Sequence, residues 1–543
     1  MILIFFLLSI AKICICFDDE FLAKIGDVEN AELIAKLNGF EIERKLQSYD
    51  DLFICRQRHH RKKRAIEDEI VEQLMLSQQI ELIEKLRKFR RCKRKAFMAG
   101  KLPTHVWNLQ PSMRIREAWK AGFNATQVTV AIVDDGVDVE HVDLRHSFTP
   151  DVSFDFVNFA NLPVPRRKSK DSQHGTQCAG LVSMMGHQCG LGVGHGANLG
   201  GIRLLGSELL DDALEGDALA FKKDHIDVYS ISWGPRDDGT SAEKPQKFTA
   251  DAIEFGARKG RRGLGNVFVW ASGNGGRNGD NCALDGYVNN EYTLSFGVVN
   301  ADGSSASYAE GCSAVIAAVS GGDAAIATTG FNQTCASISG SSAGAAIAAG
   351  VIALAIQANP SMSQRDIQHL IAIASNPDAI RNVEWHRNGA GYRFNSHVGF
   401  GLLDAEKMVR LAKHWVGIGP ELACREDLVQ TNITAFHSIE LGVPFNGCSV
   451  GHIERVVVAM SLIHSRRGQL SVWLRSPTGT VSRLLAPRPL DDQANLLNWQ
   501  FVSTHFFGES PEGDWSVLVS SETPLQFRVE NLSLKVAGSR IYK

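Results

Sequence analysis

Short apolar runs of strand length alternate with helical stretches from about residue 105 to residue 415. The runs that we expect to be strands are VTVAIVD (128–134), DVYSIS (227–232), NVFVWAS (266–272) and LSFGVV (294–299). Several are apolar throughout, as strands buried on both faces are. Their alternation with helices predicts an α/β domain with a doubly wound parallel sheet. We expect residues 342–357 to form a buried helix and residues 398–415 to hold the last helix of this region.

The pattern differs on both sides of this region. Residues 17–55 predict a small mixed α/β unit, and residues 65–86 have helical periodicity without glycine or proline. Beyond about residue 420, strand-like segments are separated by turn signals such as Ser-Pro-Thr-Gly at 476–479. This C-terminal part predicts an all-β module, a sandwich or a barrel.

Length and composition indicate a multidomain protein of the secretory pathway. A chain of 543 residues is too long for one ordinary core, so we expect two to four domains. Residues 2–10 are apolar but too short to cross a bilayer, and we interpret them as a secretory signal cut near Cys16. The net charge of −3 gives no global field that would favour nucleic acid or a membrane surface. No later segment holds 18 uninterrupted apolar residues, so we expect a soluble protein with no membrane anchor.

Secretion also favours covalent modifications. Some of the eleven cysteines are expected to form disulfides in an oxidising compartment. Four sequons are candidate glycosylation sites, at Asn124, Asn332, Asn432 and Asn531.

Residues 340–344, Gly-Ser-Ser-Ala-Gly, raise the question of a nucleophile. They match the G-x-S-x-G elbow of esterases, which requires an acid and then a histidine later in the chain. The later histidines, His369, His386 and His397, lie in no distinctive context. Small residues here could also serve only to let a helix pack closely.

The upstream sequence offers a better set of partners. Asp134 ends one predicted strand, His174 precedes a helical stretch, and Asn274 follows another strand. Open α/β sheets carry their chemistry at the carboxyl ends of the strands. The order Asp, His, Asn, Ser is that of subtilisin-type serine proteases.

These residue types suit acyl transfer. Ser342 would attack a carbonyl, His174 would accept and return its proton, and Asp134 would orient the imidazole. The Asn274 amide and the backbone N–H of Ser342 would stabilise the oxyanion.

Longer motifs strengthen this interpretation and identify a family. The chain resembles the proprotein convertases, the kexin and furin family of subtilisin-like proteases, in six blocks: DDG (134–136), HGTQCAG (174–180), SWGPRDDG (232–239), GRRGLGNVFVWASGNGG (260–276), GFGLLDA (399–405) and RRGQLSVWLRSPTGT (466–480). The resemblance implies a signal peptide at 1–16, an inhibitory propeptide at 17–94, a subtilisin-like catalytic domain at 95–417 and a β-rich P domain at 418–543.

The resemblance also implies a substrate site. The family cleaves secreted precursors and prohormones after paired or multiple basic residues, and we expect a monomeric enzyme of the secretory lumen or the extracellular space. By family match, Asp237 and Asp285 receive the arginine before the cut, Asp135 and Asp171 the next residue back, and Glu215 and Glu243 a basic residue four positions back. The family's substrate-binding segment is Ser232, Trp233 and Gly234.

The family uses calcium and disulfides, and both have matches here. Asp237, Asp280 and Glu310 match the calcium site beside the arginine pocket. A second site would use Asp143, but the neighbouring loop 184–190 is shorter than in the family and lacks its asparagine. The implied disulfides are Cys189–Cys335, Cys282–Cys312 and Cys424–Cys448, and Cys178 would remain a buried thiol. Residues Ile338, Ala346 and Gln469 depart from the family pattern near the serine and in the P domain.

Two basic runs look like the enzyme's own substrate sites. Arg91-Cys92-Lys93-Arg94 and Arg61-Lys62-Lys63-Arg64 each place basic residues at the first, second and fourth positions before a bond. We expect cleavage after Arg94 to free the catalytic domain and cleavage after Arg64 to release the propeptide, which acts as an inhibitor until then. His59 and His60 beside the second site would make release pH-sensitive.

Two other functions remain open at this point. One is a catalytically impaired, convertase-like binding protein, and the other is an esterase that uses residues 340–344.

Overall fold

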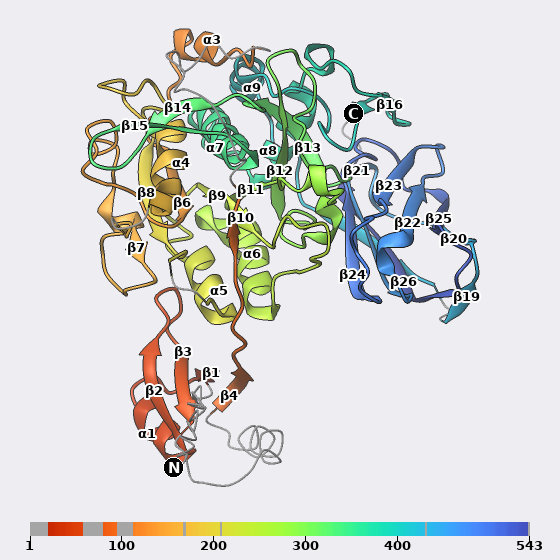
Figure 1. The fold of residues 1–543 in the computed structure, drawn as a ribbon, viewed down its shortest axis with the longest axis horizontal. Coiled ribbons are helices and arrows are strands. Elements are labelled where there is room, and N and C mark those ends of the chain that lie inside the picture. The colour runs from red at the N-terminus through yellow and green to blue at the C-terminus, as the bar shows by residue number, and fades with distance from the viewer. Residues whose placement is uncertain are drawn as a thin grey trace, which may run out of the picture. The chain divides into compact units, whose positions relative to one another are not determined.

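The computed structural model describes residues 20–57, 80–94, 112–166, 170–206, 209–428 and 432–540 (Figure 1). The chain forms two compact units, residues 1–88 and residues 89–543. The predicted pH-sensing pair His59 and His60 and the cleavage site at Arg64 lie outside the described residues.

The first unit is a small antiparallel sheet with one helix. Its strands have the order β2-β3-β1-β4. The elements are β1 (Glu20–Ile25), α1 (Ala31–Leu37), β2 (Phe40–Lys45), β3 (Leu52–Gln57) and β4 (Ile80–Lys85). The mixed α/β character predicted for this part of the chain is confirmed.

The helix predicted for residues 65–86 is wrong at its C-terminal end. Residues 80–85 are β4, which pairs antiparallel with β1 and places Ile83 opposite Ala23. Ile80 and Ile83 are buried with a spacing of three, which resembles a helix in the sequence. Pairing with β1 outweighs this local preference, because it satisfies the backbone of both strands. Residues 65–79 lie outside the described part of the chain.

The central element of the second unit is a seven-stranded parallel sheet with the order β13-β12-β11-β9-β6-β8-β7. The doubly wound sheet that the sequence predicts is therefore confirmed. Its strands are β6 (Thr129–Asp134), β7 (Phe154–Asp155), β8 (Asn198–Arg203), β9 (Val228–Ile231), β11 (Val267–Ala271), β12 (Thr293–Val299) and β13 (Val315–Ser320).

Helices cover both faces of this sheet. In β6, Val130 and Ile132 enter one apolar core, while Ala131 and Val133 enter the other. This alternation explains why residues 130–133 of the strand are all apolar. The helices on the first face are α3 (Ile115–Lys120), α4 (His174–Ser183), α7 (Ser341–Ala358), α8 (Gln364–Ala374) and α9 (Ala405–Ala412), and those on the second are α5 (Asp212–Ala220) and α6 (Lys247–Lys259).

Helix α7 is the buried helix predicted at 342–357. It is long and apolar enough to cross a membrane by length and composition, but 89% of it is buried inside the protein. Its small residues allow close packing, since a Cβ on Gly350 would lie only 2.6 Å from Cβ of Val193. Helix α7 is therefore the core helix of this domain.

Three further pairs of short antiparallel strands belong to the same compact unit. They are β5 (Cys92–Lys93) with β10 (Trp233–Gly234), β14 (Ile326–Thr329) with β15 (Cys335–Ile338), and β16 (His386–Arg387) with β17 (Arg393–Phe394).

The C-terminal part is a β-sandwich, blue in Figure 1. One sheet has the order β18-β26-β21-β24 with β19 paired to β26, and the other has the order β20-β25-β22-β23. The strands are β18 (Leu422–Asp427), β19 (Ile433–Ala435), β20 (Ser438–Phe445), β21 (His452–Ile463), β22 (Leu470–Arg475), β23 (Val481–Leu485), β24 (Leu496–Ser503), β25 (Gly513–Ser521) and β26 (Phe527–Ser539).

Buried polar contacts join the sandwich to the α/β domain. Arg365 of α8 forms a two-pronged ion pair with Glu454 of β21, at 2.5 and 2.8 Å. Arg488, which is buried, donates to the carbonyl oxygens of Gly239 and Ser241 at 3.0 and 2.7 Å. A buried charge is costly unless it is paired, so these contacts fix how the two domains meet.

Candidate active site

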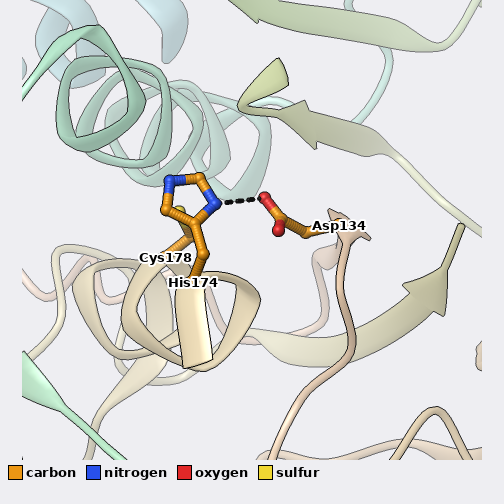
Figure 2. Close-up of side chains that lie close together, drawn as sticks. All are labelled: Asp134, His174 and Cys178. Atoms are coloured by element: carbon orange, nitrogen blue, oxygen red, sulfur yellow. Dashed lines mark hydrogen bonds and ion pairs between the residues drawn. The ribbon is translucent and has the colours of Figure 1, made fainter. Parts of the chain in front are cut away.

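Asp134 and His174 form a buried pair at the carboxyl end of the sheet (Figure 2). Asp134 is the last residue of β6, and His174 begins α4. Nδ1 of His174 lies 2.7 Å from Oδ2 of Asp134. Burial favours the neutral acid, but the imidazole of His174 and the ammonium of Lys93 outweigh it and lower the pKa of Asp134. The ionised aspartate therefore holds Nδ1 as a donor, which leaves Nε2 for chemistry.

Cys178 lies one helical turn after His174 and close to the same pair (Figure 2). Ligand atoms of Asp134, His174 and Cys178 all lie within 4.8 Å of one another, a spacing that could suit a metal ion. The thiol is buried and lies 3.7 Å from Oγ of Ser232. Because Asp134 already orients His174, we assign the aspartate and histidine to catalysis.

Ser342 is the second residue of α7. Gly340 precedes the helix with a φ of 98°, a conformation that disfavours residues with a Cβ. Oγ of Ser342 lies 3.3 Å from the carbonyl oxygen of Ser232 and also contacts the carbonyl oxygen of Arg94. The esterase alternative gains no support here, because His369, one of the later histidines that it would need, lies 3.1 Å from Glu454 at the sandwich.

The side-chain amide of Asn274 forms a hydrogen bond through its oxygen but not through its nitrogen within the described part of the chain. Its Oδ1 accepts the backbone N–H of Ser341 at 2.9 Å. Its Nδ2 donor is buried and has no hydrogen-bond acceptor within the described part of the chain, and the Nε2 atom of His174 likewise has no hydrogen-bond partner there. Buried polar atoms without partners are rare, and a catalytic role is one explanation for them. Nδ2 of Asn274 is suited to donate a hydrogen bond to an oxyanion, and Nε2 of His174 is suited to accept and return a proton.

Residues 92–94 of the same chain lie in this site as an added strand. Cys92 and Lys93 pair antiparallel with Gly234 and Trp233. The backbone N–H of Arg94 donates to the carbonyl oxygen of Ser232 at 3.1 Å. Gly234 is required beside this strand, because a Cβ there would collide with the guanidinium of Arg94.

Arg94 fills a closed pocket that ends in carboxylates. Its side chain is 1% exposed and pairs with Asp285, and its Nε lies 3.7 Å from Oδ1 of Asp237. It also donates to the backbone carbonyl of Ala271. The planar guanidinium, with its several fixed partners, fits the geometry of this pocket.

The two preceding basic side chains also meet acids. Nζ of Lys93 lies 2.6 Å from Oδ2 of Asp135. Nε and Nη1 of Arg91 lie 3.1 and 2.9 Å from Glu215 and Glu243. The side chain of Asp171, also expected near Lys93, lies outside what the structure describes.

Asp237, Asp280 and Glu310 lie behind the arginine pocket. Burial, and then the charges of Asp280 and Asp237, raise the pKa of Glu310 well above its usual range. Asp237, Asp280 and Glu310 together offer the carboxylate oxygen ligands that Ca²⁺ prefers. These residues fit a calcium ion, with Glu310 also held by the N–H of Gly275 at 2.9 Å.

The carboxylate of Asp143 does not fit a calcium ion. It accepts the backbone N–H groups of His187, Gln188 and Cys189 at 2.5, 3.1 and 2.7 Å. Three successive N–H groups form a cradle for an anion, and their positive ends would repel a cation. Asp143 therefore anchors the short loop 184–190, which the disulfide at Cys189 also holds.

The predicted cysteine pairs lie at bonding distance. The structure joins Cys189 to Cys335, Cys282 to Cys312 and Cys424 to Cys448. Of the four sequon asparagines, Asn332, Asn432 and Asn531 are exposed and Asn124 is half-buried.

Two residues of the site have no signal in the sequence pattern. Tyr287 accepts a hydrogen bond from Arg91 and donates one to Glu215. Arg488 of the sandwich lies 3.5 Å from Asp280. Both residues lie far in sequence from the groups that they contact, so the sequence pattern around the site could not reveal them.

Comparison with known proteins agrees with this geometry. The chain matches the subtilase family over residues 125–401, the proprotein convertase P-domain over 453–536 and the peptidase S8 pro-domain over 20–94. Among solved structures, the serine protease of Aeromonas sobria has a TM-score of 0.68 and 23% identity, over 79% of this chain and 91% of that one. This likeness shows the fold.

Curated relatives extend the similarity over nearly the whole chain. Endoprotease aex-5 of Caenorhabditis elegans is 57% identical over 531 residues, 97% of each chain. Furin-1 of Xenopus laevis is 40% identical over 74% of this chain and 53% of its own length. The human proprotein convertase subtilisin/kexin type 4 is 38% identical over 77% of this chain and 58% of its own length. With the Asp–His pair, the serine and the P domain in place, this chain belongs to the proprotein convertases, serine endoproteases of the subtilase family.

Proposed function

We propose that this protein is a calcium-dependent endoprotease that cleaves secreted precursors after paired or multiple basic residues and activates itself at Arg94. One observation carries this proposal. Residues Arg91, Lys93 and Arg94 of the chain lie against the acids Glu215, Asp135 and Asp285, and the carbonyl of Arg94 contacts Ser342. The chain thus presents its own basic site to its own nucleophile.

The mechanism follows from these positions. Oγ of Ser342 attacks the carbonyl carbon of Arg94, or of the equivalent residue in a precursor. Nε2 of His174 accepts the hydroxyl proton and returns it to the departing amine, while Asp134 holds Nδ1. The Nδ2 group of Asn274 stabilises the charge on the carbonyl oxygen, a contribution of typically about 100- to 1000-fold in rate.

Calcium has a supporting role in this proposal. Asp237, Asp280 and Glu310 would hold the ion. When bound, it would neutralise the buried carboxylates behind the arginine pocket. Asp237 also accepts the N–H of Asn274 at 3.1 Å, so the same residue joins the pocket wall to the oxyanion donor.

The propeptide would act as the enzyme's own inhibitor until it is released. The strand at 92–94 blocks the site as long as it stays bound. We place the enzyme in the secretory lumen or outside the cell as a soluble monomer, on the strength of the predicted signal, the disulfides and the convertase relatives. Precursors with dibasic sites are its proposed substrates.

Sequencing the N-terminus of the secreted protein tests self-activation. We expect the mature chain to begin at Lys95 and to cleave an Arg-Ser-Lys-Arg peptide after its last arginine. A calcium chelator should abolish turnover, and added Ca²⁺ should restore it. A peptide ending in Ala in place of the last Arg is the control. A mature chain that begins elsewhere, or turnover that is unaffected by chelation, would contradict the respective part of the proposal.

The preference for arginine four residues before the cut should depend on pH. Burial raises the pKa of Glu215 to about 7, although Arg91 opposes this shift. A carboxyl with a raised pKa is ionised only above that value, so its attraction for arginine is lost as the pH falls through about 7. The ratio of kcat/KM for Arg over Ala at this position should fall by up to about 10-fold between pH 8 and pH 6. The ratio of the two peptides cancels any pH dependence that both reactions share, and Glu215→Gln should give a ratio that does not change with pH.

A further inference from the structure

Phe89 is the first residue of the second unit and lies six positions before the proposed cut. Its N–H donates to the carbonyl oxygen of Leu210, and the N–H of Leu210 donates to its carbonyl oxygen, both at 2.8 Å. This pair of bonds continues the strand-like binding of residues 92–94 and holds Phe89 whatever its side chain is. The backbone of Phe89 is therefore held by hydrogen bonds, and its side chain packs against the catalytic domain.

The ring of Phe89 covers the arginine that lies four positions before the cut. The Cζ atom of Arg91 lies 4.1 Å from the centre of this ring. Phe89 is half-buried and packs against the apolar cluster to which Leu210 and Tyr287 belong. Arg90, the residue between, is exposed, and its backbone carbonyl oxygen accepts a hydrogen bond from Nη1 of Arg91 at 3.3 Å.

The catalytic domain accepts the N–H groups of the Arg91 guanidinium and covers one of its faces with a ring. Glu215, Glu243 and the hydroxyl of Tyr287 accept its N–H groups. The Tyr287 ring centre lies 4.9 Å from Cζ. With Phe89 in place, the side chain of Arg91 is 2% exposed. N–H donors lie in the plane of a guanidinium, so the hydrogen bonds leave its faces to be covered by rings.

We propose, on the basis of the proposed cleavage after Arg94, that substrate recognition extends to the sixth residue before the cut, where an aromatic side chain is preferred because it stacks on the arginine at the fourth. The substrate then supplies one wall of the pocket for its own arginine. An aromatic ring gives both apolar cover and attraction to the cation, whereas an aliphatic side chain gives only the cover. The preference should therefore depend on the arginine.

Four peptides test this coupling with the mature enzyme. They carry Phe or Leu at the sixth position and Arg or Ala at the fourth, with Lys-Arg before the cut in all of them. With arginine present, kcat/KM should be about 3- to 30-fold higher for Phe than for Leu. With alanine, the difference between Phe and Leu should disappear. Changing the fifth residue from Arg to Gln is the matched control and should leave the Phe preference unchanged.

The outcomes separate this inference from the proposed function. Equal cleavage of the Phe and Leu peptides that contain arginine would overturn the inference. A Phe advantage that persists with alanine would also overturn it, since it would show an ordinary apolar pocket. If none of the four peptides is cleaved after Arg, the proposed function fails. In the full chain, Phe89→Leu should slow self-cleavage by a similar factor.

Discussion

Replacing Ser342 with alanine is expected to stop self-cleavage and to lower peptide turnover by about a millionfold, the size of effect seen when the nucleophile of a related serine protease is removed. The physical reason is that Oγ of Ser342 is the atom that contacts the carbonyl of Arg94. The secreted variant should run on a gel at the size of the uncleaved chain. N-terminal sequencing and a peptide assay measure the two effects.

Two controls make this experiment decisive. Ser361→Ala removes an exposed serine hydroxyl, which bonds to Asn359, and should mature normally. Adding active enzyme to the Ser342→Ala protein should cleave it after Arg94, which shows that the variant is folded and its cleavage site accessible. Normal maturation of Ser342→Ala in the absence of other proteases would refute Ser342 as the nucleophile, whereas a wild-type protein that neither matures nor cleaves the peptide would leave the binding-protein alternative.

Asp285→Asn is expected to have the second largest effect. The change keeps the size of the side chain but leaves the buried guanidinium before the cut without its closest charged partner. Breaking a buried ion pair costs about 3 to 5 kcal/mol, so kcat/KM for an Arg-Ser-Lys-Arg peptide should fall by about 100- to 5000-fold. The variant should first be matured by added wild-type enzyme, because it will process itself poorly.

A peptide with a neutral residue before the cut tests whether the lost charge of Asp285 causes the fall in kcat/KM. With citrulline in place of the last arginine, the difference between wild type and Asp285→Asn should shrink greatly, since no cation needs pairing. Asp251→Asn, on the exposed face of α6, is the matched control and should leave both rates unchanged. If Asp285→Asn lowered kcat/KM by the same factor for both peptides, Asp285 would support the fold of the pocket and not its selectivity for a charged side chain.

Much of this protein could be predicted from local pattern. Residues 130–133 of β6 and all residues of β11 are apolar because both faces of the sheet are covered, and this property is visible in the sequence. Asp134, His174, Asn274 and Ser342 stand at the ends of such elements, where parallel sheets place their chemistry. Residue type, order and position relative to the strands were sufficient to propose these four as the catalytic residues.

Other features depended on tertiary contacts. Residues 80–85 have the periodicity of a helix, but they are a strand because β1 offers a partner. Asp143 is an acid in a family calcium motif, but the folded loop turns three N–H groups toward it, and a sequence does not show the direction of an N–H.

From the sequence alone, the parallel sheet, the proposed catalytic residues and the basic segment 91–94 could be predicted, because each depends on residue type and short spacing. The tertiary structure adds what else surrounds Arg91, beside the Glu215 that the family match predicts. Tyr287 lies 196 residues further along the chain, and the ring of Phe89 covers Arg91 where the backbone of Phe89 pairs with Leu210. A buried cation is costly unless its donors and faces are covered, and contacts that depend on the fold in this way leave no local pattern in the sequence.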